Sequence, residues 1–337
     1  MKMNYQGLFS IIVPVYNRPD EVRELMESLS RQTDRGFEVV IVEDGSTISC
    51  KATAESFSPQ VALQYFYKDN EGRSPARNFG MKHAHGDYFV FVDSDCILPP
   101  DYIENLRKTL GKTPADCFGG PDDAHSSFTD TQKAINFAMT SFLTTGGIRG
   151  GKVQMEKFVP RTFNMGFSRE VYEKVGGFRE MFSEDIDMST RIRLAGYSPQ
   201  LFREVKVFHK RRGNLAKFWR QVHVFGMSRI TLQLLYPGSM KPVHWAPAVF
   251  VTGVVAMILG AIFWTPWCLL PLGIYLLALW ISAIASTKSL KVGTMALAAS
   301  MVQLFGYGTG FLRAYIWKIL LRHGRDEEQE IRLRKGK

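Results

Sequence analysis

The sequence predicts an α/β domain built on a doubly wound sheet, followed by an all-α segment that crosses a membrane. In the first two thirds of the chain, short runs of β-branched and aromatic residues alternate with stretches of helical periodicity, as when crossover helices join the strands of one sheet. Further on, residues 245–287 contain no Asp, Glu, Lys, Arg or His, although the 337-residue chain has a net charge of +10.

The expected strands are short apolar runs bounded by turn-forming residues. They are Ser10–Val15, Phe37–Val42, Val61–Tyr67, Tyr88–Val92 and Glu204–Phe208. The alternation of strands with helices favours a parallel, doubly wound sheet.

The expected helices show apolar residues on one face; in the first of them Val22, Leu25 and Leu29 share a face. In a second, Ser74 is expected as the N-cap, with Pro75 at the first helical position. The expected helices of this domain are Asp20–Gln32, Ser74–Ala84, Pro100–Leu110, Thr131–Phe142, Val171–Gly177 and Glu184–Ala195.

Acidic residues follow two of these strands. Asp93 and Asp95 come directly after Tyr88–Val92, and Glu43 and Asp44 follow the second strand. Ligands of open α/β sheets gather at the carboxyl ends of strands, and two carboxylates there suit a hard cation such as Mg²⁺ or Mn²⁺. Taken alone, each pair also fits a simpler explanation, a polar strand end with a capping Asp or an Asp-Gly turn.

Several short motifs occur in a fixed order. They are Val13-Pro-Val-Tyr-Asn17, Val42-Glu-Asp-Gly-Ser46, Gly72-Arg-Ser-Pro-Ala-Arg-Asn-Phe-Gly80, Val92-Asp-Ser-Asp95, Arg161-Thr-Phe-Asn-Met-Gly-Phe167, Gly176-Gly-Phe178 and Phe182-Ser-Glu-Asp185. Each is weak alone, but in this order they resemble the family 2 glycosyltransferases of the GT-A fold, over roughly residues 8–212.

The resemblance implies a mixed GT-A sheet and a nucleotide-sugar donor, of which a UDP-sugar is favoured. It implies that Asp95 is a direct metal ligand and that Asp93 contacts the metal or the ribose. The remaining nucleotide contacts that it implies are Pro14, Tyr16, Glu43, Asp44 and Arg77, the last of these toward the diphosphate or the base.

The resemblance also implies that Asp185 is the base that deprotonates the acceptor hydroxyl, with Glu184 as its neighbour, and that transfer inverts the anomeric carbon. Acids in the first turn after Ser183 would also stabilise a helix N-terminus without any catalytic role.

The cluster His209-Lys-Arg-Arg212 has two explanations that the sequence leaves open. His209 is either a further metal or diphosphate ligand, with Arg211 or Arg212 pairing the phosphates, or part of a basic membrane-surface cluster. The Gln-x-x-Arg-Trp motif of processive family members is missing: the nearest match, Gln221–Phe225, lacks its arginine and tryptophan. This favours transfer of a single residue over a processive polysaccharide synthase, and the intact acidic motifs argue against a non-catalytic nucleotide-sugar-binding subunit.

The apolar part predicts three membrane helices, at about 246–264, 267–286 and 292–312. The expected organisation is a catalytic domain at 1–212, an amphipathic interfacial linker at 213–244, transmembrane helices within 245–320 and a charged tail at 321–337. Three crossings would place the basic tail outside the cytosol, whereas the positive-inside rule favours a cytosolic tail. The apolar segments and the charge of the tail therefore predict different numbers of crossings.

The remaining features of the sequence concern the location of the protein in the cell and its partners. Met1–Phe9 is polar and Ile11–Val15 is too short for a secretion signal, so the first domain is expected in the cytosol, at the inner membrane. The four cysteines lack metal-ligand spacing, and no nucleic-acid motif accompanies the positive charge. The expected partners are a nucleotide sugar and a membrane lipid or lipid-linked glycan acceptor; the oligomeric state is not predicted.

Overall fold

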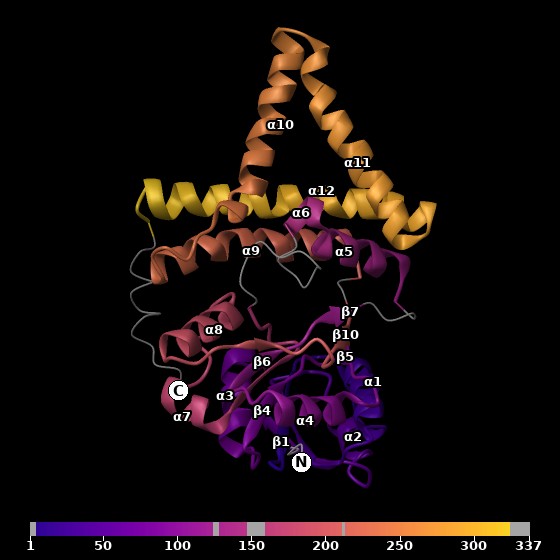
Figure 1. Cartoon of the computed structure of the whole chain (residues 1–337), viewed down its shortest axis with the longest axis vertical. Helices are drawn as coiled ribbons and strands as arrows, with labels where there is room; N and C mark the ends of the chain where they lie inside the picture. The colour runs from indigo at the N-terminus through magenta and orange to yellow at the C-terminus, as the bar shows by residue number, and fades with distance from the viewer. Residues whose placement is uncertain (1–4, 124–127, 147–158, 211–212, 324–337) are drawn as a thin grey trace. The chain divides into compact units, whose positions relative to one another are not determined.

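The computed structural model describes residues 5–123, 128–146, 159–210 and 213–323. The described residues fall into two compact units (Figure 1). The α/β unit comprises residues 5–123 and 159–209, and the helical unit comprises residues 128–146, 210 and 213–323. The basic residues Arg211 and Arg212 and the charged tail after 323 lie outside the described residues.

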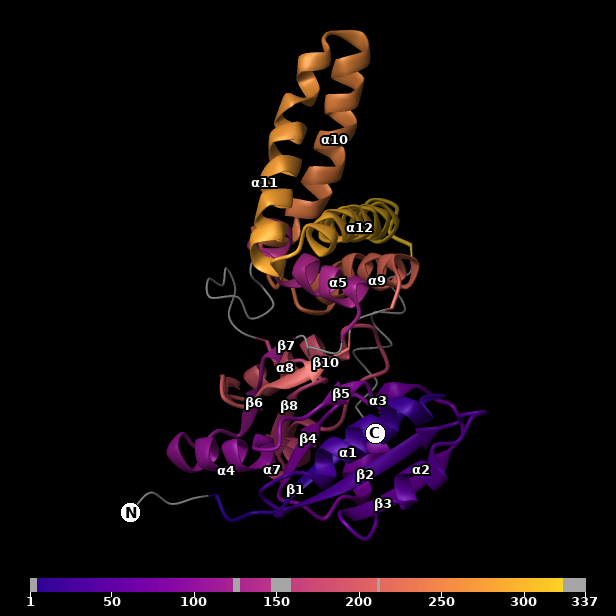
Figure 2. The ribbon, with the colours of Figure 1, turned by 90° about the vertical axis from the view of Figure 1, so that its right-hand side faces the viewer.

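The main sheet of the α/β unit has seven strands in the order β3-β2-β1-β4-β8-β6-β9. The first four strands are parallel, as expected, and β1, β2 and β3 lie side by side (Figure 2). β8 runs antiparallel to β4 and β6, which makes the sheet mixed. The bounds are β1 Phe9–Val15, β2 Phe37–Asp44, β3 Ala62–Lys68, β4 Tyr88–Phe91, β6 Cys117–Gly119, β8 Met165–Ser168 and β9 Gln200–Leu201.

Helices cover both faces of this sheet. Alternate residues of one strand, such as Ile11 and Ile12, belong to different apolar clusters, one shared with α1 and α4 and the other with α3, α7 and α8. Burial on both faces explains why the strands are continuous apolar runs. The helices are α1 Pro19–Ser30, α2 Lys51–Glu55, α3 Arg73–His83, α4 Tyr102–Lys112, α7 Arg169–Val175 and α8 Glu184–Leu194.

The start of α3 differs from the expected one. Its N-cap is Gly72, at φ +97°, and Ser74 is the second helical residue and is buried. A left-handed backbone is available to glycine without strain, so the helix begins two residues before Pro75. As a result, Arg77 and Asn78 lie in the second turn of the helix rather than in the first.

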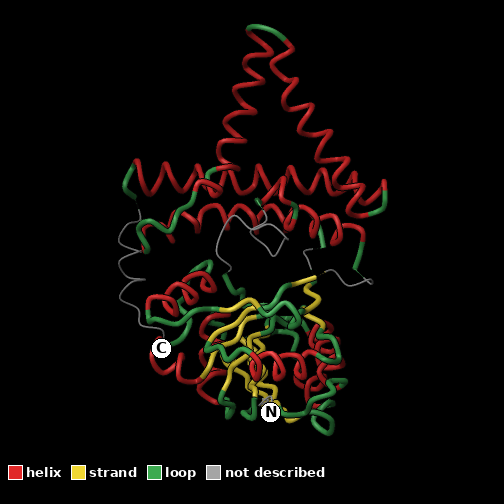
Figure 3. The backbone as a smooth tube through the Cα atoms, viewed as in Figure 1, coloured by secondary structure: helices red, strands yellow, loops and turns green. Residues whose placement is uncertain are grey.

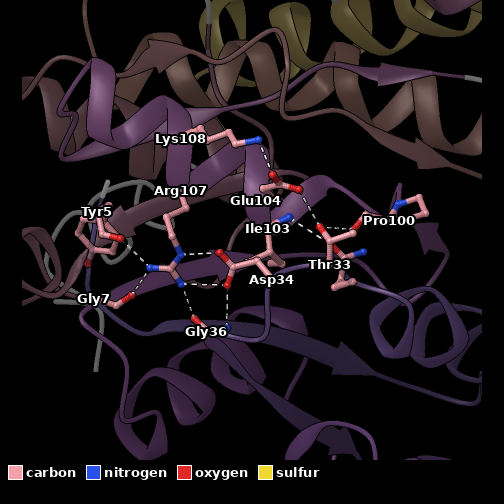
Figure 4. A network of polar contacts seen from close by, with 11 residues as sticks. Tyr5, Gly7, Thr33, Asp34, Gly36, Pro100, Ile103, Glu104, Arg107 and Lys108 are labelled. Atoms are coloured by element: carbon pink, nitrogen blue, oxygen red, sulfur yellow. Dashed lines mark hydrogen bonds and ion pairs between the residues drawn. The ribbon is translucent and has the colours of Figure 1, made fainter. Parts of the chain in front are cut away.

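A polar cluster closes the end of the sheet where β1 and β2 begin (Figure 4). Arg107 of α4 donates to the Asp34 carboxylate at 2.6 Å and to the carbonyls of Tyr5, Gly7 and Gly36 at 2.7–3.0 Å. Burial opposes ionisation of Asp34, but the hydrogen bonds from Arg107 and Gly36 outweigh it and hold the pKa of this carboxyl below its ordinary value. This cluster joins α4 to the amino ends of the strands.

A second, small sheet lies in the same unit. It has the order β5-β10-β7, where β5 is Cys96–Ile97, β10 is Val207–His209 and β7 is Asp122–Asp123. β10 runs antiparallel to β5 and parallel to β7. The expected strand Glu204–Phe208 is therefore shorter and lies in this sheet rather than in the main one.

The helical unit consists of helices and connecting loops (Figure 3). α9, Leu215–Leu235, lies within the expected linker at 213–244, while α5 belongs to this unit although it precedes residue 212. Among the described residues, three helices are long and apolar enough to cross a membrane: Ala246–Phe263, Pro266–Thr287 and Leu290–Leu320. The helices are α5 Asp130–Thr140, α6 Phe142–Thr145, α9 Leu215–Leu235, α10 Ala246–Phe263, α11 Leu270–Thr287 and α12 Leu290–Ala314, with short turns at Pro242–His244, Pro266–Leu269 and Tyr315–Leu320.

Candidate active site

The loops that follow β1, β2 and β4 are joined at the carboxyl edge of the main sheet. Asn17, at φ +53°, accepts hydrogen bonds from the backbone N–H groups of Thr47 and Ile48 at 2.8 and 2.9 Å. Arg18 reaches from the β1 loop to the Asp95 carboxylate at 2.8 Å. These contacts hold the acids of separate strands at one edge, as expected for the carboxyl ends of parallel strands.

Glu43 and Asp44 end β2, and both carboxylates bind neighbouring loops. Glu43 is buried and accepts hydrogen bonds from the Tyr65 hydroxyl, the Ser49 hydroxyl and the Cys50 N–H. Burial opposes ionisation, but these donors outweigh it and lower the pKa of the Glu43 carboxyl. The sequence placed Glu43 near the nucleotide base; its contacts in the structure hold the loop after β2.

Asp44 organises the loop between β3 and α3. Its carboxylate accepts from the N–H groups of Glu71 and Gly72 at 3.0 and 2.8 Å and pairs with the Lys68 ammonium at 3.0 Å. Pro14 lies partly buried in β1, and Tyr16 follows that strand with 51% of its surface exposed. An exposed aromatic ring at this edge provides a face on which a nucleotide base can stack.

Arg77 joins two of the acidic motifs. Its guanidinium, 2% exposed, donates to Asp93 Oδ1 at 2.8 Å and to Glu184 Oε1 at 2.9 Å. Arg73, one turn earlier on α3, donates to the other oxygen of Glu184 at 2.7 Å. Burial raises the pKa of the Glu184 carboxyl, and the two guanidinium groups offset part of that rise. The family resemblance implies that Arg77 faces the diphosphate or the base; in the structure its buried guanidinium binds Asp93 and Glu184.

Asp185 lies in the first turn of α8, directly after Glu184. Its carboxylate lies 3.3 Å from Arg161 Nη1 and is 17% exposed. The preceding residue, Ser183, stands at the N-cap with φ +63°, whereas a capping serine usually has an extended backbone. A serine in the left-handed region is uncommon, and such backbone conformations concentrate at functional sites.

The small sheet brings Asp95, His209 and Asp122 together. Asp95 precedes β5, His209 ends β10 and Asp122 begins β7. His209 Nε2 lies 3.2 Å from Asp95 Oδ1, and His209 Nδ1 lies 3.7 Å from Asp122 Oδ2. The imidazole stacks on the Phe163 ring at a centroid distance of 4.8 Å, which fixes its plane.

Asp95, Cys96 and His209 place one potential ligand atom each within 4.8 Å of one another. Burial raises the pKa of the Cys96 thiol well above its ordinary value, and the thiol donates to the Phe163 carbonyl, so it is a poor ligand for a hard cation. Carboxylate and imidazole together fit Mn²⁺, with Mg²⁺ as the harder alternative. Arg18 already supplies positive charge to the second oxygen of Asp95.

Four residues of this edge are missing from the expectations drawn from sequence: Arg18, Arg73, Asp122 and Arg161. Arg73 and Arg161 lie inside two of the family motifs, and this position is the sequence feature that points to a role in the site. Arg18 directly follows another motif. Asp122 has no motif, and it meets His209 only through the pairing of β7 with β10.

Comparisons with known proteins concern the family and the fold of this chain. Residues 10–176 match the model of the glycosyl transferase family 2, a range that includes Asp44, Asp93 and Asp95 and ends before Glu184. A stretch of 101 residues, 30% of the chain, is 42% identical to an uncharacterized glycosyltransferase of Rickettsia felis. A stretch of 108 residues, 32% of the chain, is 38% identical to glycosyltransferase GlyA of Streptococcus pneumoniae. These stretches span only 17% and 16% of the two relatives' own lengths.

Among solved structures, the chain is similar to the mannosyltransferase PcManGT from Pyrobaculum calidifontis, which was solved in complex with GDP-Man and Mn²⁺. The TM-score is 0.56 at 20% sequence identity, and the likeness covers 95% of this chain and 88% of that one. At this identity the similarity concerns the fold. By the family model, the relatives and the mixed sheet, residues 10–176 of this chain belong to the glycosyl transferase family 2, and the chain has the GT-A fold.

Proposed function

We propose that this chain transfers a sugar from a nucleotide-diphosphate donor to a hydroxyl acceptor with inversion at the anomeric carbon. The observation that carries the proposal is the bridge from Asp93 through Arg77 to Glu184, because it ties the donor-side acids after β4 to the start of α8, where Asp185 lies. Transfer requires that the groups that bind the leaving diphosphate and the base that deprotonates the attacking hydroxyl lie within one site.

Asp185 is the proposed general base. It takes the proton of the acceptor hydroxyl as the new glycosidic bond forms, and proton transfer of this kind is typically worth about 10²–10⁴-fold in rate. Arg161, at 3.3 Å, keeps the carboxylate oriented, and Glu184 holds the start of α8 through its two arginines.

A divalent cation would be held by Asp95 and His209, with Asp93 nearby as a ligand or as a contact to the ribose. When bound, the metal would offset the charge of the leaving diphosphate. Asp122 is the proposed orienting group: with Nδ1–H of His209 turned toward its carboxylate, Nε2 is left facing Asp95. Pro14, Tyr16 and Asp44 are the proposed contacts of the nucleoside.

The nucleobase of the donor is to be determined by experiment. The sequence favours a UDP-sugar, and the GDP-mannose complex of the similar mannosyltransferase makes GDP-sugars the second class to test. We place the α/β unit in the cytosol at the inner membrane, attached by the apolar helices of the helical unit, with a lipid-linked acceptor. Residues 1–212 would carry catalysis, and the helices after 245 the membrane attachment.

The test is a donor screen on the purified full chain in lipid nanodiscs. UDP- and GDP-sugars are supplied in turn with Mn²⁺, with Mg²⁺ or with a chelator, and released nucleotide is measured with and without a lipid-phosphate acceptor. We expect turnover with one nucleotide class and its loss on chelation. Absence of turnover with every donor, in protein that still binds nucleotide, would contradict the proposal.

A further inference from the structure

The helix α12 packs against other helices on two opposite sides. A Cβ atom on Gly306 would lie 2.5 Å from a Val222 methyl, and one on Gly310 would lie 2.1 Å from the His223 carbonyl, so this face touches α9. A Cβ atom on Gly308 would lie 2.4 Å from the carbonyl of Pro247, at the start of α10. Residues two positions apart face nearly opposite ways on a helix, so α12 lies between α9 and α10.

On one side, α5 and α9 follow α12 one after the other (Figure 1). Near the start of α12, Lys291 pairs with Asp130 of α5 at 2.8 Å. Just beyond its end, Lys318 donates to the Thr231 hydroxyl of α9 at 3.1 Å. α5 and α9 also share one apolar cluster with α12. Both ends of α12 are therefore bound to helices of a single layer.

On the other side, α10 and α11 leave this layer as a hairpin (Figure 1). α11 returns to it where a Cβ atom on Gly293 of α12 would lie 2.6 Å from an Ile284 side-chain carbon. Between these contacts the hairpin exposes large apolar side chains. They include Ile262, Phe263, Trp264, Trp267, Ile274 and Leu277.

The length of α12 does not decide whether it crosses a membrane, since α10, α11 and α12 are all long enough. The packing of α12 against its neighbours distinguishes it from α10 and α11. If α12 crossed, α9 would enter the hydrocarbon beside it with Lys217, Arg220 and Arg229, and charged side chains at that depth are costly. α12 itself buries Ser300 and Gln303 inside the unit, whereas α10 and α11 are exposed and uncharged.

We propose that α10 and α11 alone cross the bilayer and that α12 lies along its surface, between the hairpin and the layer of α5 and α9. His323, just after α12, then lies on the side of the bilayer where α9 begins, which is the cytosolic side under the attachment proposed above. Arg313, Lys318 and Arg322 lie on that side, in agreement with the positive-inside rule. This topology rests on the membrane attachment proposed above, and it replaces the third crossing expected at 292–312.

The test uses cysteine labelling of the full chain in a bacterial host. Cys268 is changed to Ser; the other three cysteines are buried. Single cysteines are then placed at the hairpin tip (Thr265→Cys), in the α/β unit (Glu55→Cys) and after α12 (His323→Cys). A membrane-impermeant maleimide added to intact cells should label Thr265→Cys alone, and all three after permeabilisation.

Labelling of His323→Cys from outside, together with Thr265→Cys, would show three crossings and overturn the inference. Failure of Thr265→Cys to be labelled would overturn it too, and release of the chain by alkaline carbonate would then show that membrane attachment itself is wrong. A fluorescent protein fused after Lys337 gives an independent measurement on the unsubstituted chain. It should fluoresce, and alkaline phosphatase fused at the same point should be inactive; the reverse pattern would contradict the topology.

Discussion

Arg77 and Glu184 are 107 positions apart in the sequence, and their side chains are joined by a hydrogen bond of 2.9 Å. Because the same guanidinium binds Asp93 at 2.8 Å, one buried arginine sets the distance between the acids after β4 and the start of α8. The chemistry proposed for this chain depends on that spacing.

Replacing Arg77 by Lys should therefore slow transfer strongly. Lysine keeps the charge, but its ammonium lacks the planar set of donors with which the guanidinium binds both carboxylates, so Asp93 and Glu184 should separate. Misplacement of about 1 Å can cost about a hundredfold in rate. Arg73→Lys is the matched control: Arg73 is 52% exposed and binds Glu184 alone, so a much smaller effect is expected. Comparable losses in both variants, measured as initial rates, would argue against the bridge.

Removing the buried charge altogether should also destabilise the fold. In Arg77→Gln, Glu184 keeps only its exposed partner, and breaking a buried pair typically costs about 3–5 kcal/mol. Chemical unfolding of the full chain in detergent, followed by tryptophan fluorescence, would measure the loss. An unchanged unfolding midpoint would show that the pair contributes little.

Asp185→Asn should abolish transfer while nucleotide binding survives. The amide keeps the shape of the carboxylate but cannot accept the acceptor's proton, so a loss of about 10²–10⁴-fold is expected. Glu55→Gln, an exposed acid paired only with Lys51 of its own helix, serves as the control. Nucleotide affinity is measured by calorimetry, and transfer at the normal rate would rule out Asp185 as the base.

His209→Ala and Asp122→Asn should weaken metal binding to different degrees. The first removes a proposed ligand, and the second removes only the group that orients it, for which losses of about 10–100-fold are usual. Binding of Mn²⁺ to the nucleotide-loaded protein is followed by electron paramagnetic resonance, without any need for turnover. If Asp122→Asn binds Mn²⁺ as the unsubstituted chain does, Asp122 has no orienting role.

Acid should destabilise the α/β unit partly through Asp34. The pKa of Asp34 is lower in the folded chain than its ordinary value of 3.8, because Arg107 and Gly36 outweigh the effect of burial. A lowered folded pKa gives stability that is present above the ordinary value and is lost as the pH falls through the folded one. Below about pH 4 the unfolding temperature should therefore drop, and Asp34→Asn should flatten that slope without removing it, since Glu38 and Glu43 also have lowered pKa values. An unchanged slope in Asp34→Asn would exclude this contribution.

Much of the site could be predicted from sequence because its acids lie in short local motifs. Asp93, Asp95, Glu184 and Asp185 were all found in this way, each at the end of a strand or the start of a helix. The partners of these acids could not be found so directly. Asp122 meets His209 only because β7 and β5 flank β10, and such pairings depend on the whole fold.

Arg77 shows a second limit. The sequence predicts that Arg77 lies on a helix, which the structure confirms, but it does not predict the direction of the guanidinium. That direction depends on which face of α3 packs on the sheet and on where Asp93 and Glu184 lie, and residues 73–83 alone carry neither piece of information.

By itself the sequence determined the first four strands, the helices that follow the first and third of them, the acids at the strand ends and the presence of long apolar helices. These features follow from local periodicity and composition, which each segment carries alone. Only the tertiary structure decided that β8 runs antiparallel, that Arg77 binds two acids and that α12 is held at both ends by one layer. Each of these is a contact between segments far apart in the chain, and no single segment contains the information on its partner.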